Sequence, residues 1–204
     1  MADYTTTTDV KNQLVETLGS TTDTTYDALI QSLITSSSRL IDGYLGVDDN
    51  YFYPSTDTQT RYFDGNGGDE LPIGSFISIS TLQVAENGTD YITWSSTDYY
   101  FHPYNAALKG KPYERIVIDV ENGSKSYFPA WRKAVKVTGI WGYCATPPQD
   151  VAQACIIQTL RAFMRAKSAY QDAGMNPNMG QMFYVRELDP DVKILLNKYV
   201  MELL

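Results

Sequence analysis

The chain contains a single histidine, His102, which lies in an aromatic run between Tyr99 and Tyr104. Histidine is the usual general base near neutral pH, and it acts together with a nucleophile or a second acid held beside it. The sequence supplies no such partner pattern, because it has no serine-hydrolase elbow, no P-loop and no zinc-protease motif. We therefore interpret His102 as structural and predict neither a catalytic site nor a cofactor.

The segment Asp64–Glu70 begins like a calcium-binding loop, with acidic and amide side chains at alternate positions. Such a loop also needs an oxygen ligand at its fifth position, glycine at the sixth and glutamate at the twelfth. Here Gly68, Asp69 and Ser75 stand at those three places. A hairpin turn explains the segment better, and we predict no metal site.

The two cysteines, Cys144 and Cys155, do not form a Cys-x-x-Cys pair. We interpret both as reduced, packed thiols of a protein made in a reducing cytoplasm. A disulfide between them is the alternative.

The chain is acidic, with a formal net charge of −8. Residues 1–50 hold 8 acidic and 2 basic side chains, residues 51–146 hold 10 and 8, and residues 147–204 hold 6 and 6. This distribution argues against a protein that grips nucleic acid, because phosphate contacts need clustered Lys and Arg. A ring of such subunits would repel DNA and help it slide through a channel, although solubility alone also explains the charge. We see no signal peptide and no apolar run long enough to span a membrane.

Apolar periodicity and turn residues predict the elements that must hold these side chains. Two helices are expected within residues 1–50, strands over residues 51–141, a long helix after Pro148 and a last helix from Asp189-Pro190. The Asp-Gly and Asn-Gly pairs at residues 64, 87 and 122 favour tight hairpins.

These elements predict an α+β fold. We expect a helical bundle of two N-terminal helices, one long helix and one C-terminal helix, with an inserted antiparallel β-sheet or small barrel. The predicted helical connector domain comprises residues 1–50 and 145–204, and the inserted β-domain comprises residues 51–144.

A strand that runs into a helix through an aromatic and proline-rich corner is the most informative segment, at residues 135–164. Glycines loosen the backbone around the tryptophan, and two prolines end strand pairing because they lack an N–H. We predict that the structural corner consists of Trp141, Gly142, Tyr143, Pro147 and Pro148.

The helix after this corner is apolar around much of its circumference. A helix that covers one side of a core needs an apolar stripe only about 100° wide. We therefore predict a second burial, against another helix of the chain or against a neighbouring subunit. The bulky face holds Ile156, Ile157, Leu160, Phe163 and Met164. The small face, which we assign to packing between subunits, holds Val151, Ala152, Cys155, Ala162 and Ala166.

The same segment carries a family resemblance. A strand ending in Val-x-Gly-x-Trp-Gly-Tyr is followed by Pro-Pro-x-Asp-Val and an alanine-rich helix. The helix start at Asp9-Val10-Lys11, the helix end at residues 38–46 and the stretch at residues 60–65 fit the same order. Over residues 8–170 the chain resembles the head-tail connector (adaptor, or head-completion) proteins of long-tailed bacteriophages.

This resemblance implies a structural virion protein and not an enzyme. It implies a homo-oligomeric ring, commonly dodecameric, between the portal protein and the tail or a stopper or tail-completion protein. The ring would extend the channel through which DNA passes during ejection, without specific DNA binding. The protein would be made in the host cytoplasm and located in the virion neck, with no membrane contact.

The C-terminal part of that family tends to engage the portal. The resemblance therefore assigns portal binding to Met175, Met179, Met182, Phe183, Tyr184, Leu196, Tyr199 and Leu203.

An alternative function starts from clustered aromatic side chains, which can stack on sugars. The cluster comprises Tyr99, Tyr100, Phe101 and Tyr104. On this hypothesis the chain is a carbohydrate-binding or receptor-binding β-module of a phage particle. Hydrophobic packing of the sheet explains the same residues without a ligand.

Overall fold

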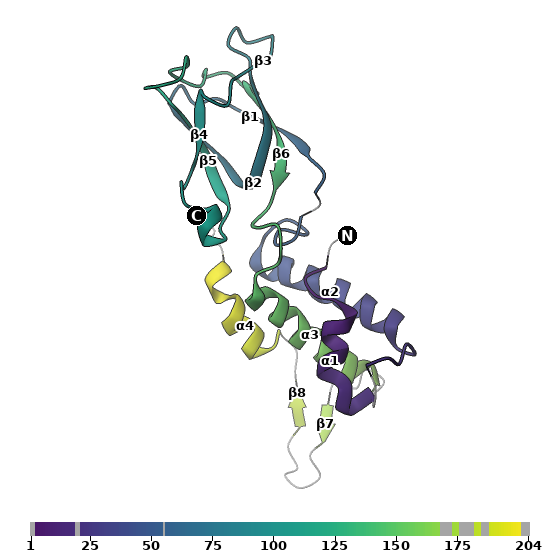
Figure 1. The fold of residues 1–204 in the computed structure, drawn as a ribbon. Helices are drawn as coiled ribbons and strands as arrows, with labels where there is room; N and C mark the ends of the chain where they lie inside the picture. The colour runs from purple at the N-terminus through teal and green to yellow at the C-terminus, as the bar shows by residue number, and fades with distance from the viewer. Residues whose placement is uncertain are drawn as a thin grey trace. The chain divides into compact units, whose positions relative to one another are not determined.

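The computed structural model describes residues 3–18, 21–54, 56–167, 173–175, 182–184 and 188–200. The chain divides into two compact units (Figure 1). Residues 1–50 and 147–204 belong to one, which we call the helical unit, and residues 51–146 form the other, the sheet unit.

The helical unit is built around one central helix. Its elements are α1 (Thr7–Leu18), α2 (Asp27–Leu45), α3 (Gln149–Lys167), α4 (Pro190–Leu196) and the 3-10 turn η2 (Asn197–Tyr199), with a small antiparallel pair of β7 (Ala173–Met175) and β8 (Met182–Tyr184). Helix α3 packs against α1, α2 and α4. Three neighbours within the subunit therefore explain why α3 is apolar around so much of its circumference.

Local chemistry fixes two of the helix starts. Thr6 and Asp9 form a reciprocal cap on α1, in which Thr6 N–H donates to the Asp9 carboxylate (3.3 Å) and Asp9 N–H donates to Thr6 Oγ1 (3.2 Å). Asp189 accepts from Asp191 N–H at 2.9 Å, and Pro190 begins α4, as the sequence predicts.

The sheet unit contains a six-stranded antiparallel sheet. Its strands are β1 (Gln59–Phe63), β2 (Glu70–Val84), β3 (Ile92–Thr93), β4 (Tyr99–His102), β5 (Tyr113–Ile118) and β6 (Val135–Trp141), and the 3-10 turn η1 (Ala107–Lys109) lies between β4 and β5. The order is β1-β6-β2-β5-β4, with β3 paired to β2. The long strand β2 pairs first with β5 and then with β6, and its register shifts between Pro72 and Phe76.

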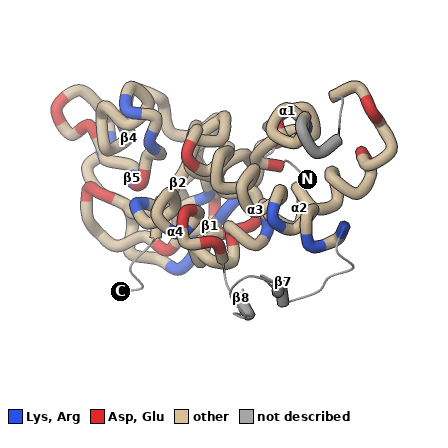
Figure 2. The backbone as a smooth tube through the Cα atoms, turned by 90° about the horizontal axis from the view of Figure 1, so that it is seen from below, with Lys and Arg blue, Asp and Glu red and all other residues tan. Residues whose placement is uncertain are grey.

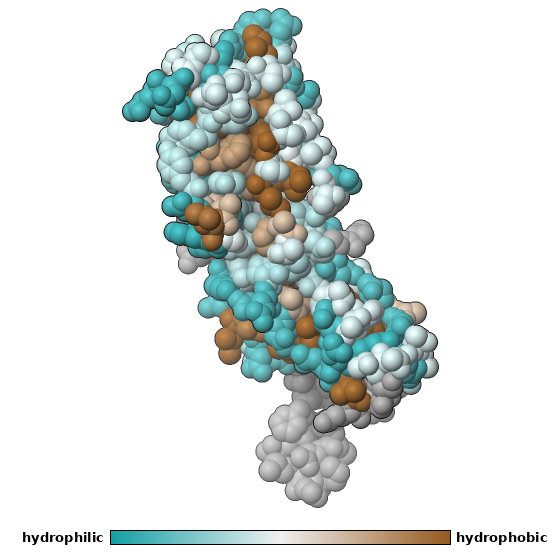
Figure 3. Space-filling model, in the orientation of Figure 1, coloured by the Kyte–Doolittle hydropathy of each residue, from teal (hydrophilic) through white to brown (hydrophobic). Residues whose placement is uncertain are grey.

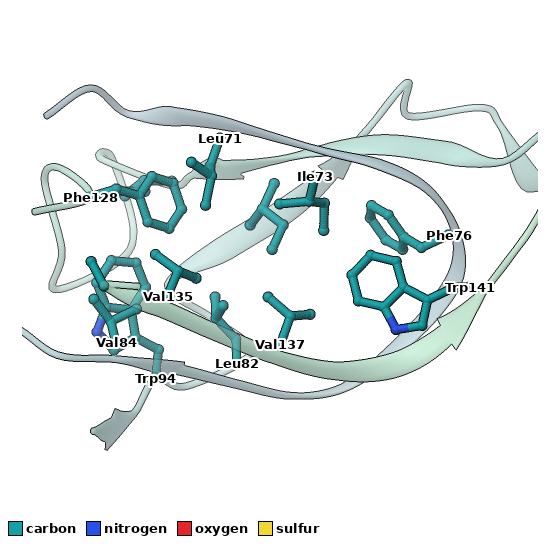
Figure 4. Packing of buried hydrophobic residues seen from close by; sticks show 13 residues of the cluster. Leu71, Ile73, Phe76, Leu82, Val84, Trp94, Phe128, Val135, Val137 and Trp141 are labelled. Atoms are coloured by element: carbon teal, nitrogen blue, oxygen red, sulfur yellow. The ribbon is translucent and has the colours of Figure 1, made fainter. Parts of the chain in front are cut away.

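The sheet closes over its own hydrophobic core (Figure 4). Side chains from β2, β5 and β6 point toward one another there, together with Trp94 and Phe128 from the connecting loops. Trp94 stacks on Phe128 with ring centroids 5.3 Å apart. Apolar residues alternate with more exposed ones along β6, which is the expected pattern for a strand with one buried face.

The prediction of a helical bundle as the main architecture is wrong. The described residues instead form a mostly antiparallel sheet of six strands together with four α-helices. Helices α1 and α4 are short, with 12 and 7 residues, so only α2 and α3, with 19 residues each, are long helices. Apolar patterning located the helices but did not show the order in which the strands pair.

Candidate interaction surfaces

The corner at residues 141–143 is held by hydrogen bonds and by a cation–ring contact. Trp141 lies under the Arg61 guanidinium, 4.5 Å from the ring centroid, and its indole N–H donates to Gln59 O at 3.0 Å. Gly142 N–H donates to Ser75 O at 3.2 Å, and Tyr143 N–H donates to Tyr51 O at 2.7 Å. These bonds tie the end of β6 to β1, to β2 and to the loop before β1.

Only glycine fits at the centre of this corner. Gly142 has a φ of +145°, and a Cβ there would lie 2.8 Å from Tyr51 O and 2.9 Å from Pro54 Cγ. The predicted corner residues Pro147 and Pro148 lie in the helical unit, where Ala152 N–H donates to Pro148 O at 3.0 Å. The five predicted corner residues are thus divided between the two units, and their structural role stays a prediction.

The small face of α3 packs mainly inside the subunit. Val151 and Cys155 are fully buried, and Cys155 Sγ lies 3.5 Å from Ser38 Oγ of α2. Small side chains on both helices allow this close approach. The remaining small-face residues, Ala152, Ala162 and Ala166, are half-buried.

A buried polar cluster attaches the start of the chain to α2. The Tyr4 hydroxyl donates to the Asp42 carboxylate, and Tyr4 N–H donates to Ser38 Oγ at 3.1 Å. Asp42 also accepts from Asn50 N–H at 3.1 Å and pairs with Arg39 at 3.0 Å. Burial raises the pKa of Asp42, and the hydrogen bonds and the arginine oppose that shift. The cluster fixes the chain that leads into α1.

An open groove lies between α1 and α3 in the helical unit. Its volume is about 580 Å³. Polar side chains of α1 and α3 make up most of the lining, and the exposed Asp9 is the only acidic residue in it. The lining residues are Tyr4, Thr5, Asp9, Asn12, Gln13, Gln149, Ala152, Gln153 and Ile156.

The aromatic cluster proposed for sugar binding separates into two groups. Tyr99 and Phe101 pack against the sheet core. Tyr100 and Tyr104 stack on each other at 4.8 Å, and their hydroxyl hydrogen bond raises the pKa of Tyr100 to about 12. His102 is half-buried beside this pair, 5.7 Å from the Tyr104 ring. The half-buried Tyr100 and the exposed Tyr104 therefore cover each other, which reduces the ring surface open to a ligand.

The residues assigned to portal binding fall in different environments. Leu196 is fully buried, and Tyr199 is partly exposed with the Lys198 ammonium 4.9 Å from its ring centroid. Met182, Phe183 and Tyr184 form strand β8, and Met175 ends β7. Met179 and Leu203 lie outside the described residues.

Metal-ligating and nucleophilic side chains are the remaining candidates for a site among the described residues. In the described ranges, His, Cys, Asp and Glu side chains do not gather into a metal-binding group. Cys144 and Cys155 are free thiols, as expected, and burial raises the pKa of each to about 11.

The segment Asp64–Glu70, which begins like a calcium-binding loop, contains a turn held by Asn66. The Asn66 side chain accepts from Gly68 N–H at 3.0 Å. Among the helices that the structure describes, none could cross a membrane.

Comparison with known proteins shows the fold. No protein-family model matches the sequence, and no curated protein matches it. A chain of the solved structure described as "Neck of empty GTA particle computed with C6 symmetry" has a TM-score of 0.54 at 13% identity, over 97% of this chain and 90% of that chain.

Two further structures agree with this match. A chain of "Virion of native gene transfer agent (GTA) particle" has a TM-score of 0.52 at 13% identity, over 97% of this chain and 90% of that chain. A chain of "Neck of native GTA particle computed with C12 symmetry" has a TM-score of 0.50 at 13% identity, over 100% and 96%. The similarity therefore spans both units of the protein.

Proposed function

We propose that the protein is a structural component of the neck of a phage-like particle. The observation that carries this proposal is the fold similarity to chains of GTA neck and virion structures over 97–100% of the chain. The resemblance to head-tail connectors over residues 8–170 supports the same function from the sequence. Assembly, and not catalysis, is then the protein's task.

The finer proposal is a ring of copies, dodecameric, between the portal and the tail or stopper. Residues 1–50 carry 8 acidic and 2 basic side chains, and Figure 2 marks the charged positions along the backbone. This excess of negative charge suits a channel through which DNA slides without being held. The half-buried alanines 152, 162 and 166 of α3 remain proposed contacts between copies. Residues 175–204 are the proposed contact with the portal.

Native mass spectrometry of the purified chain, alone and with rings of its cognate portal protein, tests this function. We expect a complex in which a fixed multiple of the 22.9 kDa chain joins one portal ring. The sample without portal is the control, because a connector subunit can stay monomeric until it meets its ring. A chain that stays monomeric in the presence of portal rings would refute the proposal.

Limited proteolysis tests the portal contact separately. Cleavage within residues 174–187 should be faster in free chains than in the complex. Equal rates in both samples would remove this segment from the contact and leave the neck function standing.

A further inference from the structure

The loops of the sheet unit contain three exposed asparagines that are each followed by glycine. The pairs are Asn66-Gly67, Asn87-Gly88 and Asn122-Gly123. The second pair lies in the loop just before β3, and Figure 3 shows mainly hydrophilic side chains at the end of the sheet unit where Figure 1 labels β3. Asparagine is a chemically labile residue, and a following glycine makes it more so, because glycine has no side chain to hinder attack by its own nitrogen.

The reaction at such a pair is an intramolecular cyclisation. The glycine nitrogen bonds to Cγ of the asparagine side chain, and the side-chain NH₂ takes the proton of that nitrogen and leaves as ammonia. One water molecule then opens the cyclic succinimide at either carbonyl, which gives aspartate or isoaspartate. The reaction therefore needs a glycine N–H that can give up its proton and an asparagine side chain that can turn toward it.

The fold removes the first requirement at all three pairs, because each glycine N–H is donated to a backbone carbonyl. A hydrogen-bonded N–H gives up its proton less readily, and its nitrogen is held away from the asparagine side chain. The three bonds run from Gly67 to Phe128 O (2.9 Å), from Gly88 to Ala85 O (3.1 Å) and from Gly123 to Asp119 O (2.7 Å).

Backbone groups also hold two of the asparagine side chains. Asn66 Nδ2 donates to Glu70 O at 2.7 Å, in addition to the bond that its Oδ1 accepts. Asn87 Oδ1 accepts from Thr89 N–H at 3.0 Å and from Asp90 N–H at 2.9 Å. Such bonds are typical of asparagine in turns, and they must break before Cγ can face the glycine nitrogen.

The third side chain, Asn122, is held by a single carboxylate. Its Nδ2 donates to both oxygens of Asp119, at 3.2 and 3.1 Å. The backbone N–H groups of Asn122 and Glu121 also donate to Asp119 Oδ1, at 3.0 and 3.2 Å. These hydrogen bonds lower the pKa of Asp119, which keeps the carboxylate charged at neutral pH.

We propose that the native fold protects the three Asn-Gly pairs from succinimide formation, and that at Asn122 the protection depends on the Asp119 carboxylate. A local opening must break the bonds at a pair before cyclisation can start, so the rate falls with the fraction of time the loop is open. An isoaspartate would route the backbone through the side chain and lengthen it by one carbon, which would disrupt the turn. This inference does not depend on the neck function, so its failure would leave that proposal standing.

Peptide mapping by mass spectrometry of the full chain tests the protection. Samples are incubated at mildly alkaline pH in buffer and in guanidinium chloride, and conversion to aspartate and isoaspartate is followed at each of the three asparagines. We expect every site to convert at least tenfold more slowly in the folded chain than in the unfolded chain. Equal rates in the two samples at any of the three sites would overturn the proposal.

A matched pair of substitutions tests the role of Asp119. In the folded chain, Asp119→Ala should speed conversion at Asn122 at least threefold and leave Asn66 and Asn87 unchanged. Asp90→Ala is the control, because the Asp90 carboxylate contacts Asn87 at 2.9 Å, so this change should leave Asn122 at the wild-type rate. The variant Asp119→Asn, which keeps an acceptor oxygen, should also convert at the wild-type rate. A wild-type rate at Asn122 in Asp119→Ala, or equal acceleration at all three sites, would overturn the assigned role.

Discussion

Replacing Ser38 with alanine should destabilise the helical unit, whereas the same change at Ser36 should not. Both serines lie in α2, two residues apart. Ser38 is fully buried and accepts the Tyr4 N–H at 3.1 Å, while the exposed Ser36 hydroxyl donates to Ser32 O at 3.0 Å. The pair therefore separates the buried polar contacts of Ser38, to Tyr4 N–H and to Cys155 Sγ, from the general effects of a serine-to-alanine change.

The magnitude follows from two opposing effects. Alanine is the better helix former, which stabilises each variant by about 0.5 kcal/mol. At Ser38 the Tyr4 N–H also loses its acceptor while Tyr4 stays 2% exposed, which costs about 1–3 kcal/mol. The helix-propensity effect cancels in the comparison, so the Ser38 variant should be less stable than the Ser36 variant by about 1–3 kcal/mol.

Urea denaturation can report this difference for each unit separately. All 3 tryptophans, at positions 94, 131 and 141, lie in the sheet unit, so their fluorescence follows that unit. Far-UV circular dichroism follows the helices. We expect the Ser38 change to move the circular dichroism transition and to leave the fluorescence transition in place.

Equal free energies of unfolding for the Ser38 and Ser36 variants would refute the reasoning. That result would mean that the Tyr4 N–H finds another acceptor, or that residues 3–6 do not pack against α2 in solution.

Two further predictions concern the corner and the thiols. Gly142→Ala should destabilise the sheet unit by about 1–3 kcal/mol, because a Cβ there would lie 2.8 Å from Tyr51 O at a φ of +145°. Gly74→Ala is its control, with a φ of +80° and open space around the Cβ, and should cost only about 1 kcal/mol in the same urea titration. Cys144 should react slowly with Ellman's reagent at neutral pH and about tenfold faster for each pH unit up to its pKa of about 11, because only the thiolate attacks. Cys155, which is fully buried, should react only on unfolding, and rapid modification of native protein at pH 7 would contradict both expectations.

Turn chemistry illustrates what local sequence can and cannot specify. The Asn87-Gly88 pair closes the hairpin between β2 and β3, as predicted. The Asp64-Gly65 pair does not close a hairpin, because β1 and β2 lie on opposite sides of β6. The Asn122-Gly123 pair likewise does not close a hairpin. It lies between β5 and β6 in the chain, but β5 pairs with β2 and β4 and not with β6. A turn dipeptide bends the chain, but the partner of each strand depends on which apolar faces meet across a long sequence separation.

Sequence by itself determined the helix start at Asp189-Pro190, the strand that ends at Trp141 and the absence of a recognisable catalytic pattern. Those features depend on residues close together in the chain, whose capping, alternation and spacing act locally. The sequence also showed that the helix after Pro148 must be buried on more than one side.

Only the tertiary structure decided what buries that helix. Helices α1, α2 and α4 pack against α3. The side chains of Ser38 in α2 and Cys155 in α3 are in contact. A helical wheel records which residues are apolar but not which distant segment will cover them, since covering requires long-range packing. The same limit applies to the Asn-Gly pairs, because the sequence shows each dipeptide but not the carbonyl oxygen that receives its glycine N–H.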